Sequence, residues 1–310
     1  MKTSAVTARD IARAVWAVPP LALAPGGELA DEENRKLVRH IEAGGVSTIL
    51  WGGNANIYAV TAAEFEALVE CAPGWSAEES WVIPSVGPDY GKLREHAAIL
   101  KRTRYPAAML LPFTGPGSPA GTERAIRDFV QAAGLPAILY MRAVQYLPPE
   151  RIAALFDDGT LVALKYAVEP DDQARDPVLE KLCTLCPRER IVSGIGEIAA
   201  IPHMRAFALA GFTAGAVCIA PRRAMAVLRA LQAGDAAQAK ALVAPIRPLE
   251  ALRMEHGPIP VLHEAVAAAG IAATGALRPH FAALPAALRA RIATAVAELS
   301  EAESHADPAA

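Results

Sequence analysis

The sequence predicts an α/β fold and, within that class, a closed (β/α)8 TIM barrel followed by a C-terminal helical extension. Eight short apolar runs of strand character alternate with amphipathic runs of helical character, the pattern of βα units around a parallel sheet. The eight pairs fit within about 220 residues, which favours a barrel over an open sheet. Hydrophobic residues make up 53% of the 310 residues, enough for one large core.

The predicted strands are continuous apolar runs rather than alternating ones, which is typical of strands buried on both faces. The first begins at Trp16. Basic residues precede it, as in a signal peptide, but Asp10 interrupts them, and Pro19 and Pro20 break the apolar run, so a core strand explains the segment better. In chain order the predicted strands are 16–23, 46–51, 81–85, 107–111, 137–140, 161–166, 190–193 and 215–219.

The predicted helices follow from amphipathic spacing and from signals at their N-termini. The run 31–43 has acidic residues early, which suits the positive end of a helix dipole. Thr61 and Glu64 have the spacing of a capping box at the start of the run 61–71. The remaining helices predicted around the barrel are 93–102, 122–133, 148–157, 177–186, 199–210 and 222–233.

Three further helical runs, 235–243, 261–269 and 286–299, follow the last βα unit without a linker or a break in composition. We therefore expect residues 1–233 to form the barrel and residues 234–303 to form helices packed on it. The last residues, 304–310, are predicted to be a disordered tail.

Composition excludes several classes of function. A net charge of -3 argues against nucleic-acid binding, which needs a clustered basic face. The chain contains no apolar stretch of the roughly 18 uncharged residues that span a membrane. Four cysteines do not make a disulfide framework, so a reducing, cytoplasmic compartment is expected. The Cys183–Cys186 pair lacks the second pair or the histidines of a zinc site, so no metal is expected.

Lys165 is the most informative residue for function, because it lies in the apolar run 161–168, which reads as a buried strand. Burying an ammonium group costs several kcal/mol unless it is paired or loses its proton. A desolvated lysine can have its pKa lowered from about 10.4 toward about 7 to 8, and the neutral amine attacks carbonyls to form a Schiff base. The alternative is a strand-end lysine whose ammonium reaches solvent or a carboxylate.

The residues at the C-terminal ends of the predicted strands are candidates for the rest of an active site. Tyr140 ends the strand before that of Lys165, and its phenol can relay protons. The alternative is a strand-end tyrosine whose ring lies in the core and whose hydroxyl is exposed to solvent. The turn at Gly52 and Gly53 lets backbone N–H groups approach an anion, or is an ordinary turn. Further candidate substrate contacts are Asn54, Asn56, Arg142 and Glu197.

Gly194, Gly196 and Ala199 match the G-x-G-x-x-A pattern of dinucleotide-binding turns, after the seventh predicted strand. No acidic residue follows at the expected distance, so we interpret the glycines as a tight βα turn. We expect no organic cofactor.

The sequence resembles the dihydrodipicolinate synthase / N-acetylneuraminate lyase family of Schiff-base (β/α)8 enzymes, from about Val15 to Leu299. The family's I-L-Y motif, whose tyrosine relays protons, matches the run that ends at Tyr140. Its V-x-x-K motif, whose lysine forms the imine, matches the run that ends at Lys165. Further matching segments are 20–31, 44–46, 211–215, 234–239 and 275–279.

The chain departs from this family in the substrate site. Members carry G-T-T-G-E after strand two, whereas residues 52–56 here read G-G-N-A-N. The region of the synthase's second tyrosine holds Phe113 and Thr114. Met141 and Arg142 replace the usual asparagine, and Gln145 aligns with the synthase's substrate-binding arginine. These differences make dihydrodipicolinate synthase activity proper the less favoured alternative.

The resemblance implies a lyase of aldolase or dehydratase type that acts on a 2-oxo acid such as pyruvate or a keto-deoxy sugar acid. Lys165 would form the imine, and Tyr140 would shuttle protons. The 52–56 loop would bind the substrate carboxylate, and Arg142 or Glu197 would contact the distal end of the substrate. The family also suggests a homodimer or homotetramer.

Two other readings remain open. In one, the protein binds a 2-oxo acid without turning it over. In the other, Lys165 is structural, and a phosphate site lies after strands seven and eight, near Gly194, Gly196 and Pro221.

Overall fold

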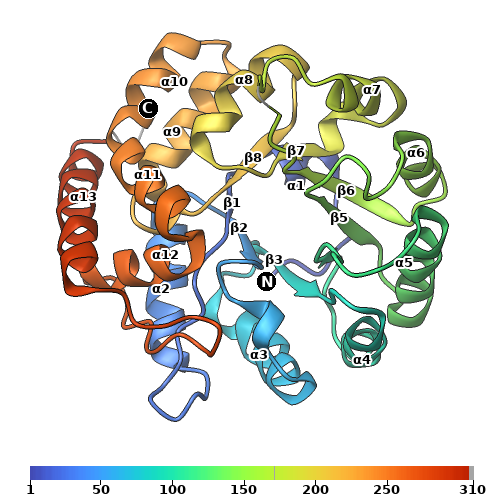
Figure 1. Cartoon of the computed structure of the whole chain (residues 1–310), viewed down its shortest axis with the longest axis horizontal. Helices are drawn as coiled ribbons and strands as arrows, with labels where there is room; N and C mark the ends of the chain where they lie inside the picture. Colours follow the sequence, from blue (N-terminus) through green and yellow to red (C-terminus); the bar gives the residue numbers. More distant parts are fainter. Residues whose placement is uncertain (171, 307–310) are drawn as a thin grey trace.

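The apolar runs of the sequence form eight parallel strands that close into a barrel, with helices on its outside (Figure 1). The computed structural model describes residues 1–170 and 172–306. Each strand pairs with its neighbour in sequence, and β1 pairs with β8 to close the ring. The strands are β1 Trp16–Ala17, β2 Thr48–Trp51, β3 Trp81–Val86, β4 Ala108–Leu110, β5 Ala137–Met141, β6 Leu161–Tyr166, β7 Ile191–Ser193 and β8 Gly211–Ala214.

The first and last strands differ from their predicted bounds. β1 ends at Ala17, before Pro19 and Pro20, which have no N–H to donate to a sheet. The prediction of a strand at 215–219 was wrong, because β8 comes earlier and Ala216–Cys218 forms a 3-10 turn, η3. Residues 214–220 are apolar apart from one glycine, so hydrophobicity alone could not place the strand; pairing with β1 and β7 fixes it.

The helices of the barrel lie close to their predicted positions. α2 has the predicted bounds, and α3 begins with the predicted capping box, in which the Glu64 carboxylate accepts a hydrogen bond from the Thr61 N–H at 2.7 Å. These helices are α2 Asp31–Ala43, α3 Ala62–Trp75, α4 Tyr90–Leu100, α5 Pro119–Ala133, α6 Pro149–Asp157, α7 Pro177–Leu185, α8 Glu197–Phe207 and α9 Pro221–Gln232. Short turns are η1 Ile57–Ala59, η2 Arg188–Arg190 and η4 Ala244–Ile246.

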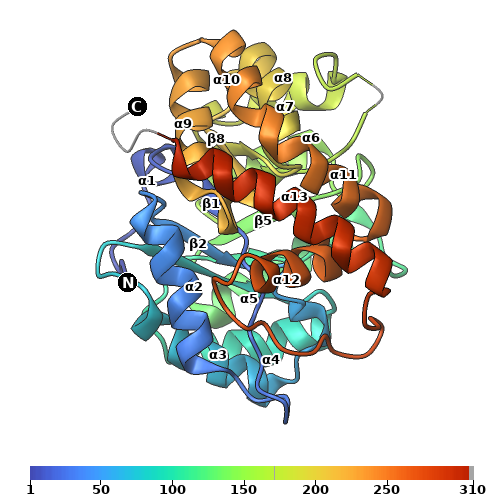
Figure 2. The same ribbon diagram turned by 90° about the vertical axis from the view of Figure 1, so that its left-hand side faces the viewer.

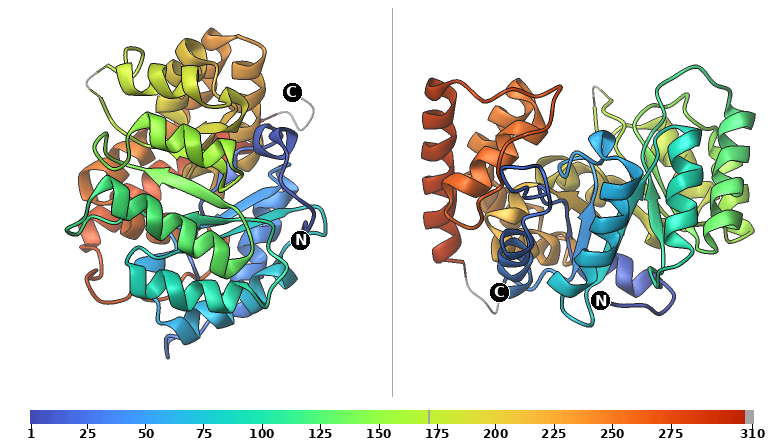
Figure 3. Two further views of the ribbon diagram at one scale, coloured as in Figure 1. Left: turned by 90° about the vertical axis from the view of Figure 1, so that its right-hand side faces the viewer. Right: turned by 90° about the horizontal axis from the view of Figure 1, so that it is seen from below.

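The C-terminal helices pack on one side of the barrel, beside α2 and α9, as Figures 2 and 3 show in orange and red. They are α10 Ala236–Val243, α11 Arg247–His256, α12 Pro258–Ala268 and α13 Ala286–Ser304. The sequence interpretation missed α11 and the short α1, Ala8–Ala12, although Pro248 in the first turn of α11 is a typical start signal. Ser304, predicted to be disordered, is the last residue of α13; the predicted tail at 307–310 lies outside the described residues.

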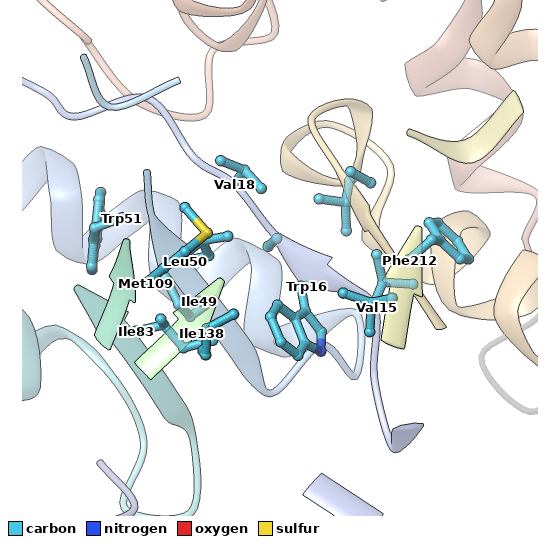
Figure 4. Close-up of a cluster of buried hydrophobic side chains, with 14 of the residues drawn as sticks. Val15, Trp16, Val18, Ile49, Leu50, Trp51, Ile83, Met109, Ile138 and Phe212 are labelled. Carbon is cyan, nitrogen blue, oxygen red and sulfur yellow. The ribbon is translucent and has the colours of Figure 1, made fainter. Parts of the chain in front are cut away.

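The barrel interior is filled by large side chains from successive strands. Figure 4 shows Trp16, Ile49, Met109 and Ile138 directed into one buried cluster, and all four are at most 1% exposed. Filling the centre in this way makes the barrel a packed core, so a ligand has access only at its ends. Among the described residues, no helix is both long enough and apolar enough to cross a membrane.

Candidate active site

Lys165 lies on β6, where the sequence predicted a buried strand lysine. Its side chain is buried, with the residue 5% exposed. Tyr140 on β5 is its direct partner across the parallel pair, so both side chains project from the same face of the sheet. The Lys165 Nζ lies 3.4 Å from the centroid of the Tyr140 ring. The structure therefore brings together the two residues predicted to carry the chemistry.

Burial lowers the pKa of Lys165, because removing an ammonium from water disfavours its charged form. Tyr140 opposes this shift, and the charge of Arg142 adds to it. The net effect is a lysine that loses its proton more readily than one in water, which is the state that attacks a carbonyl.

Tyr140 has the opposite balance. Burial raises the pKa of its phenol, but the positive charges of Lys165 and Arg142 outweigh burial and lower the pKa overall. A phenol of lowered pKa beside an amine of lowered pKa can exchange a proton with it at small cost, which suits a relay.

Gly194 provides the space that Lys165 needs. A methyl group at Gly194 would lie 3.0 Å from the Lys165 Cγ and 2.9 Å from the Tyr166 carbonyl oxygen. Gly196 has a backbone φ of 101°, a conformation that residues with a side chain rarely adopt. The two glycines of the G-x-G-x-x-A pattern are thus explained by packing and backbone geometry, as a tight βα turn requires.

The loop after β2, residues 52–56, reaches the same end of the barrel as Lys165. A methyl group at Gly52 would come within 3.3 Å of Ser85 and Met109, whereas one at Gly53 would meet open space. Asn56 has left-handed backbone geometry, with a φ of 52°, and its buried side-chain nitrogen has no hydrogen-bond partner among the described residues. This loop therefore has open space beside Gly53 and one buried amide donor, on Asn56, without a partner among the described residues.

Asn54 is positioned differently from its neighbours in the loop. Its side-chain nitrogen donates to the Val18 carbonyl oxygen at 2.8 Å, and its side-chain oxygen accepts a hydrogen bond from Arg253 at 3.5 Å. The fold thus uses its amide, which favours the loop backbone and Asn56 over the Asn54 side chain as donors to a substrate.

Glu197 is the first residue of α8, and its side chain is completely buried. Burial and the nearby Glu250 raise its pKa to about 8. Arg253 of α11 lies in the same cluster and donates to the Glu250 carboxylate at 2.5 Å. The predicted contact of Glu197 with substrate stays a prediction, and complete burial argues against it.

A comparison with known families identifies the chain. Residues 15–299 match the model of the dihydrodipicolinate synthetase family. The chain belongs to this family. Membership confirms the predicted barrel and the predicted enzyme class, a lyase acting on a 2-oxo acid.

Relatives of this dihydrodipicolinate synthetase family member include both synthases and lyases. The chain is 27% identical over 227 residues to a probable 5-dehydro-4-deoxyglucarate dehydratase of Streptomyces coelicolor, covering 70% of each protein. Its fold matches dihydrodipicolinate synthase of Bacillus clausii with a TM-score of 0.83, at 20% identity, over 94% of this chain and 99% of that one. N-acetylneuraminate lyase of Fusobacterium nucleatum gives 0.80 at 14% identity, over 93% and 99%.

Sequence reasoning missed one residue of this family member's site. Tyr58, in η1 directly after the β2 loop, is half-buried. Burial and, to a smaller degree, nearby Tyr140 raise the pKa of its phenol to about 12, and the charge of Arg142 opposes this shift. This mutual influence places Tyr58 near the predicted relay. Arg142, by contrast, was predicted, and its charge lowers the pKa of both Lys165 and Tyr140. In the sequence, only its position shortly after the Gly52–Gly53 turn could have indicated Tyr58.

Phe113 is the residue that the sequence resemblance predicts in the region of the synthase's second tyrosine. It is 37% exposed and lines a cavity of about 490 Å³ together with Tyr90 and Tyr146. Lys165 and Tyr140 do not line this cavity, which lies between α4 and α5. Phe113 has no hydroxyl, so it cannot replace a tyrosine in a proton relay.

Proposed function

We propose that Lys165 forms a Schiff base with a 2-oxo acid and that the protein cleaves or forms a bond next to the imine carbon. The observation that carries this proposal is the Lys165–Tyr140 pair, a buried amine of lowered pKa whose Nζ lies 3.4 Å from the centroid of the phenol ring. Such a pair has no evident use in the stability of the barrel, because burying a lysine without a carboxylate partner costs free energy.

In the proposed reaction, the neutral Lys165 amine attacks the C2 keto carbon. The resulting carbinolamine loses water to give a protonated imine, with Tyr140 passing the proton that water needs to leave. The imine withdraws electrons from the adjacent bond, so that a proton on C3 can leave and an enamine forms. Tyr140 and Tyr58 are the phenols available for these transfers.

The substrate carboxylate is proposed to bind the backbone of Gly52 and Gly53 and the unused amide of Asn56. A glycine turn exposes N–H groups that suit an anion, and the side chain of Asn54 is engaged elsewhere. Arg142 is exposed and close enough to influence both Lys165 and Tyr140, so it is the proposed contact for the distal end of the substrate.

Several observations bear on the substrate and on the type of lyase. The Streptomyces coelicolor relative is a probable dehydratase of a sugar acid, which supports loss of water from a keto-deoxy sugar acid. A structural neighbour at 18% identity and TM-score 0.78, a prophage protein of the family from E. coli K12, was crystallised with pyruvate. The family resemblance supports a homodimer or homotetramer, and free cysteines at positions 71, 183, 186 and 218 support a reducing cytoplasmic compartment.

Borohydride trapping tests the proposal directly. The wild-type protein is incubated with pyruvate or a keto-deoxy sugar acid and reduced, and the adduct is measured by intact mass and peptide mapping. We expect a stable adduct on Lys165 that is absent in Lys165→Ala, and formation slowed roughly 10²- to 10⁴-fold in Tyr140→Phe.

The outcome also separates the alternatives. An adduct on Lys165 without turnover of any tested acid would favour a non-catalytic binder. Absence of an adduct with every 2-oxo acid would refute the Schiff-base proposal and favour the reading in which Lys165 is structural.

A further inference from the structure

We infer that Arg253 of α11 and His263 of α12 are positioning residues, which hold the 52–56 loop in the shape that binds the substrate carboxylate. This inference rests on the proposed function, because it gives the loop its task. It assigns a role in the reaction to the C-terminal helices, which lie outside the barrel and contribute no strand to it (Figure 2).

The contact made by His263 is the clearest evidence. His263 is 5% exposed, and its Nε2 lies 3.1 Å from the Asn54 carbonyl oxygen. Since a carbonyl only accepts, the proton must be on Nε2. Burial lowers the pKa of His263 to about 4, although the contact with Asn54 opposes the shift, so the ring is neutral at physiological pH. The backbone of His263 is held in turn by Thr274, whose hydroxyl donates to its carbonyl oxygen at 3.1 Å.

Arg253 reaches the same residue of the loop from a neighbouring helix. Its Nη2 lies 3.5 Å from the Asn54 side-chain oxygen, and its Nη1 donates to Glu250 at 2.5 Å. The guanidinium packs on Gly215 at the end of β8, where a methyl group would lie 2.6 Å from the Arg253 Cζ. The position of the guanidinium is therefore fixed by an ion pair and by the backbone beneath it.

Asn54 is thus held from three directions, by Val18 after β1, by α11 and by α12. The two residues before it, Gly52 and Gly53, have no side chains to restrict their backbone, and glycine loses more conformational entropy than any other residue when it is ordered. A glycine turn that must present its N–H groups to an anion needs an anchor next to it. Asn54 is that anchor, and Arg253 and His263 fix it.

The inference predicts a specific defect. Losing the His263 hydrogen bond should loosen the loop and weaken binding of the carboxylate. Lys165 on β6 and Tyr140 on β5 should keep their geometry. Compounds that bear a carboxylate should therefore lose affinity, and an uncharged keto compound should not. A general loss of stability would affect both alike.

The experiment uses the full-length protein and borohydride trapping on Lys165, with pyruvate and with its uncharged methyl ester as probes. His263→Leu removes the donor, and His263→Gln keeps an N–H near the position of Nε2. His40→Leu is the matched control, because the His40 Nε2 makes a similar contact, at 3.2 Å, with the Ile219 carbonyl oxygen away from the loop. The half-saturating concentration and the maximal rate of trapping are measured for each variant.

We expect the half-saturating pyruvate concentration to rise roughly three- to tenfold in His263→Leu, as loss of one buried hydrogen bond implies. It should return near the wild-type value in His263→Gln and remain unchanged in His40→Leu, and the methyl ester should show no such difference. Equal losses for both probes, or no change in His263→Leu, would overturn the inference while leaving the imine chemistry intact. Failure of the wild type to trap pyruvate and every other 2-oxo acid would overturn the proposed function and the inference together.

Discussion

Lys165 and Tyr140 show how two residues on neighbouring strands change each other's acidity. Burial alone would leave one as an amine that resists protonation and the other as a phenol that resists ionisation. Placed as register partners, each offsets part of the burial effect on the other, and the charge of Arg142 lowers the pKa of both. The proposed reactivity therefore belongs to the pair.

A buried lysine that serves chemistry should cost stability. The pKa of Lys165 is lower in the folded chain than in the unfolded chain, so between its lowered folded pKa and about pH 10 the unfolded state binds more protons at this site. We expect Lys165→Met to abolish the adduct and to raise the free energy of unfolding at pH 7 by roughly 1–3 kcal/mol, because it removes a buried charge.

Denaturant unfolding at pH 7 and at about pH 10.5 measures this effect. The increase in the free energy of unfolding caused by Lys165→Met should be smaller at the higher pH, because the lysine of the unfolded chain also loses its proton there. A variant that is less stable than the wild type at pH 7 would contradict the expectation. Lys36→Met on the exposed side of α2 serves as the control for replacing a lysine.

At the scale of elements, the junction between α8, α11 and the end of β8 is an unusual buried polar cluster. Both carboxylate oxygens of Glu197 are buried, and no described side chain donates a hydrogen bond to them; the backbone N–H groups of Glu197 and Val217 offset the effect of burial only in part. Glu250, Arg253 and the Cys218 thiol are the ionisable groups around it. The pKa of Glu197 is raised first by burial and then by Glu250, so this carboxyl stays protonated at neutral pH.

This cluster predicts a pH-dependent effect of Glu197→Gln. Folded Glu197 keeps its proton to about pH 8, whereas in the unfolded chain it ionises near its usual value of 4.5. The folded state binds more protons between these values, so stability falls as pH rises through that window and then levels off. Glutamine has no proton to lose, so the variant should match the wild type near pH 4.5 and exceed it by up to a few kcal/mol at pH 8.

Thermal unfolding at several pH values tests this expectation, with Glu298→Gln on the exposed face of α13 as the control. The difference between Glu197→Gln and the wild type should grow with pH, and that for the control should not. A difference that stays constant from pH 4.5 to pH 8 would show that Glu197 ionises normally in the folded protein.

At the scale of the whole molecule, the C-terminal segment and the barrel are joined by an ion pair, by close backbone contact and by a shared hydrophobic core. Arg278, in the segment before α13, forms an ion pair with Glu64 of α3 at 2.6 Å. A methyl group at Gly275 would lie 2.0 Å from the carbonyl oxygen of Leu23, so the two backbones are in close contact. Fully buried side chains such as Ile246, Leu249 and Ile292 extend the same hydrophobic core into the extension.

We therefore expect the barrel and its extension to unfold together. Differential scanning calorimetry should give a single transition whose calorimetric enthalpy equals its van't Hoff enthalpy per cooperative unit. Two resolved transitions, with the trapping of pyruvate surviving the first, would show that the extension is an independent domain and does not support the site.

The sequence by itself determined the barrel, because eight apolar runs and the helices between them are local patterns, and it indicated Lys165, since a charge in such a run is a local anomaly. It also paired Lys165 with Tyr140 through the order of the strands. It misplaced β8 because neighbouring apolar residues look alike until strands pair, and it missed α11. Only the tertiary structure decided the contacts of Asn54 and Glu197, because their partners come from helices far along the chain. It also decided the pKa values of Glu197 and Tyr58, because burial raises both.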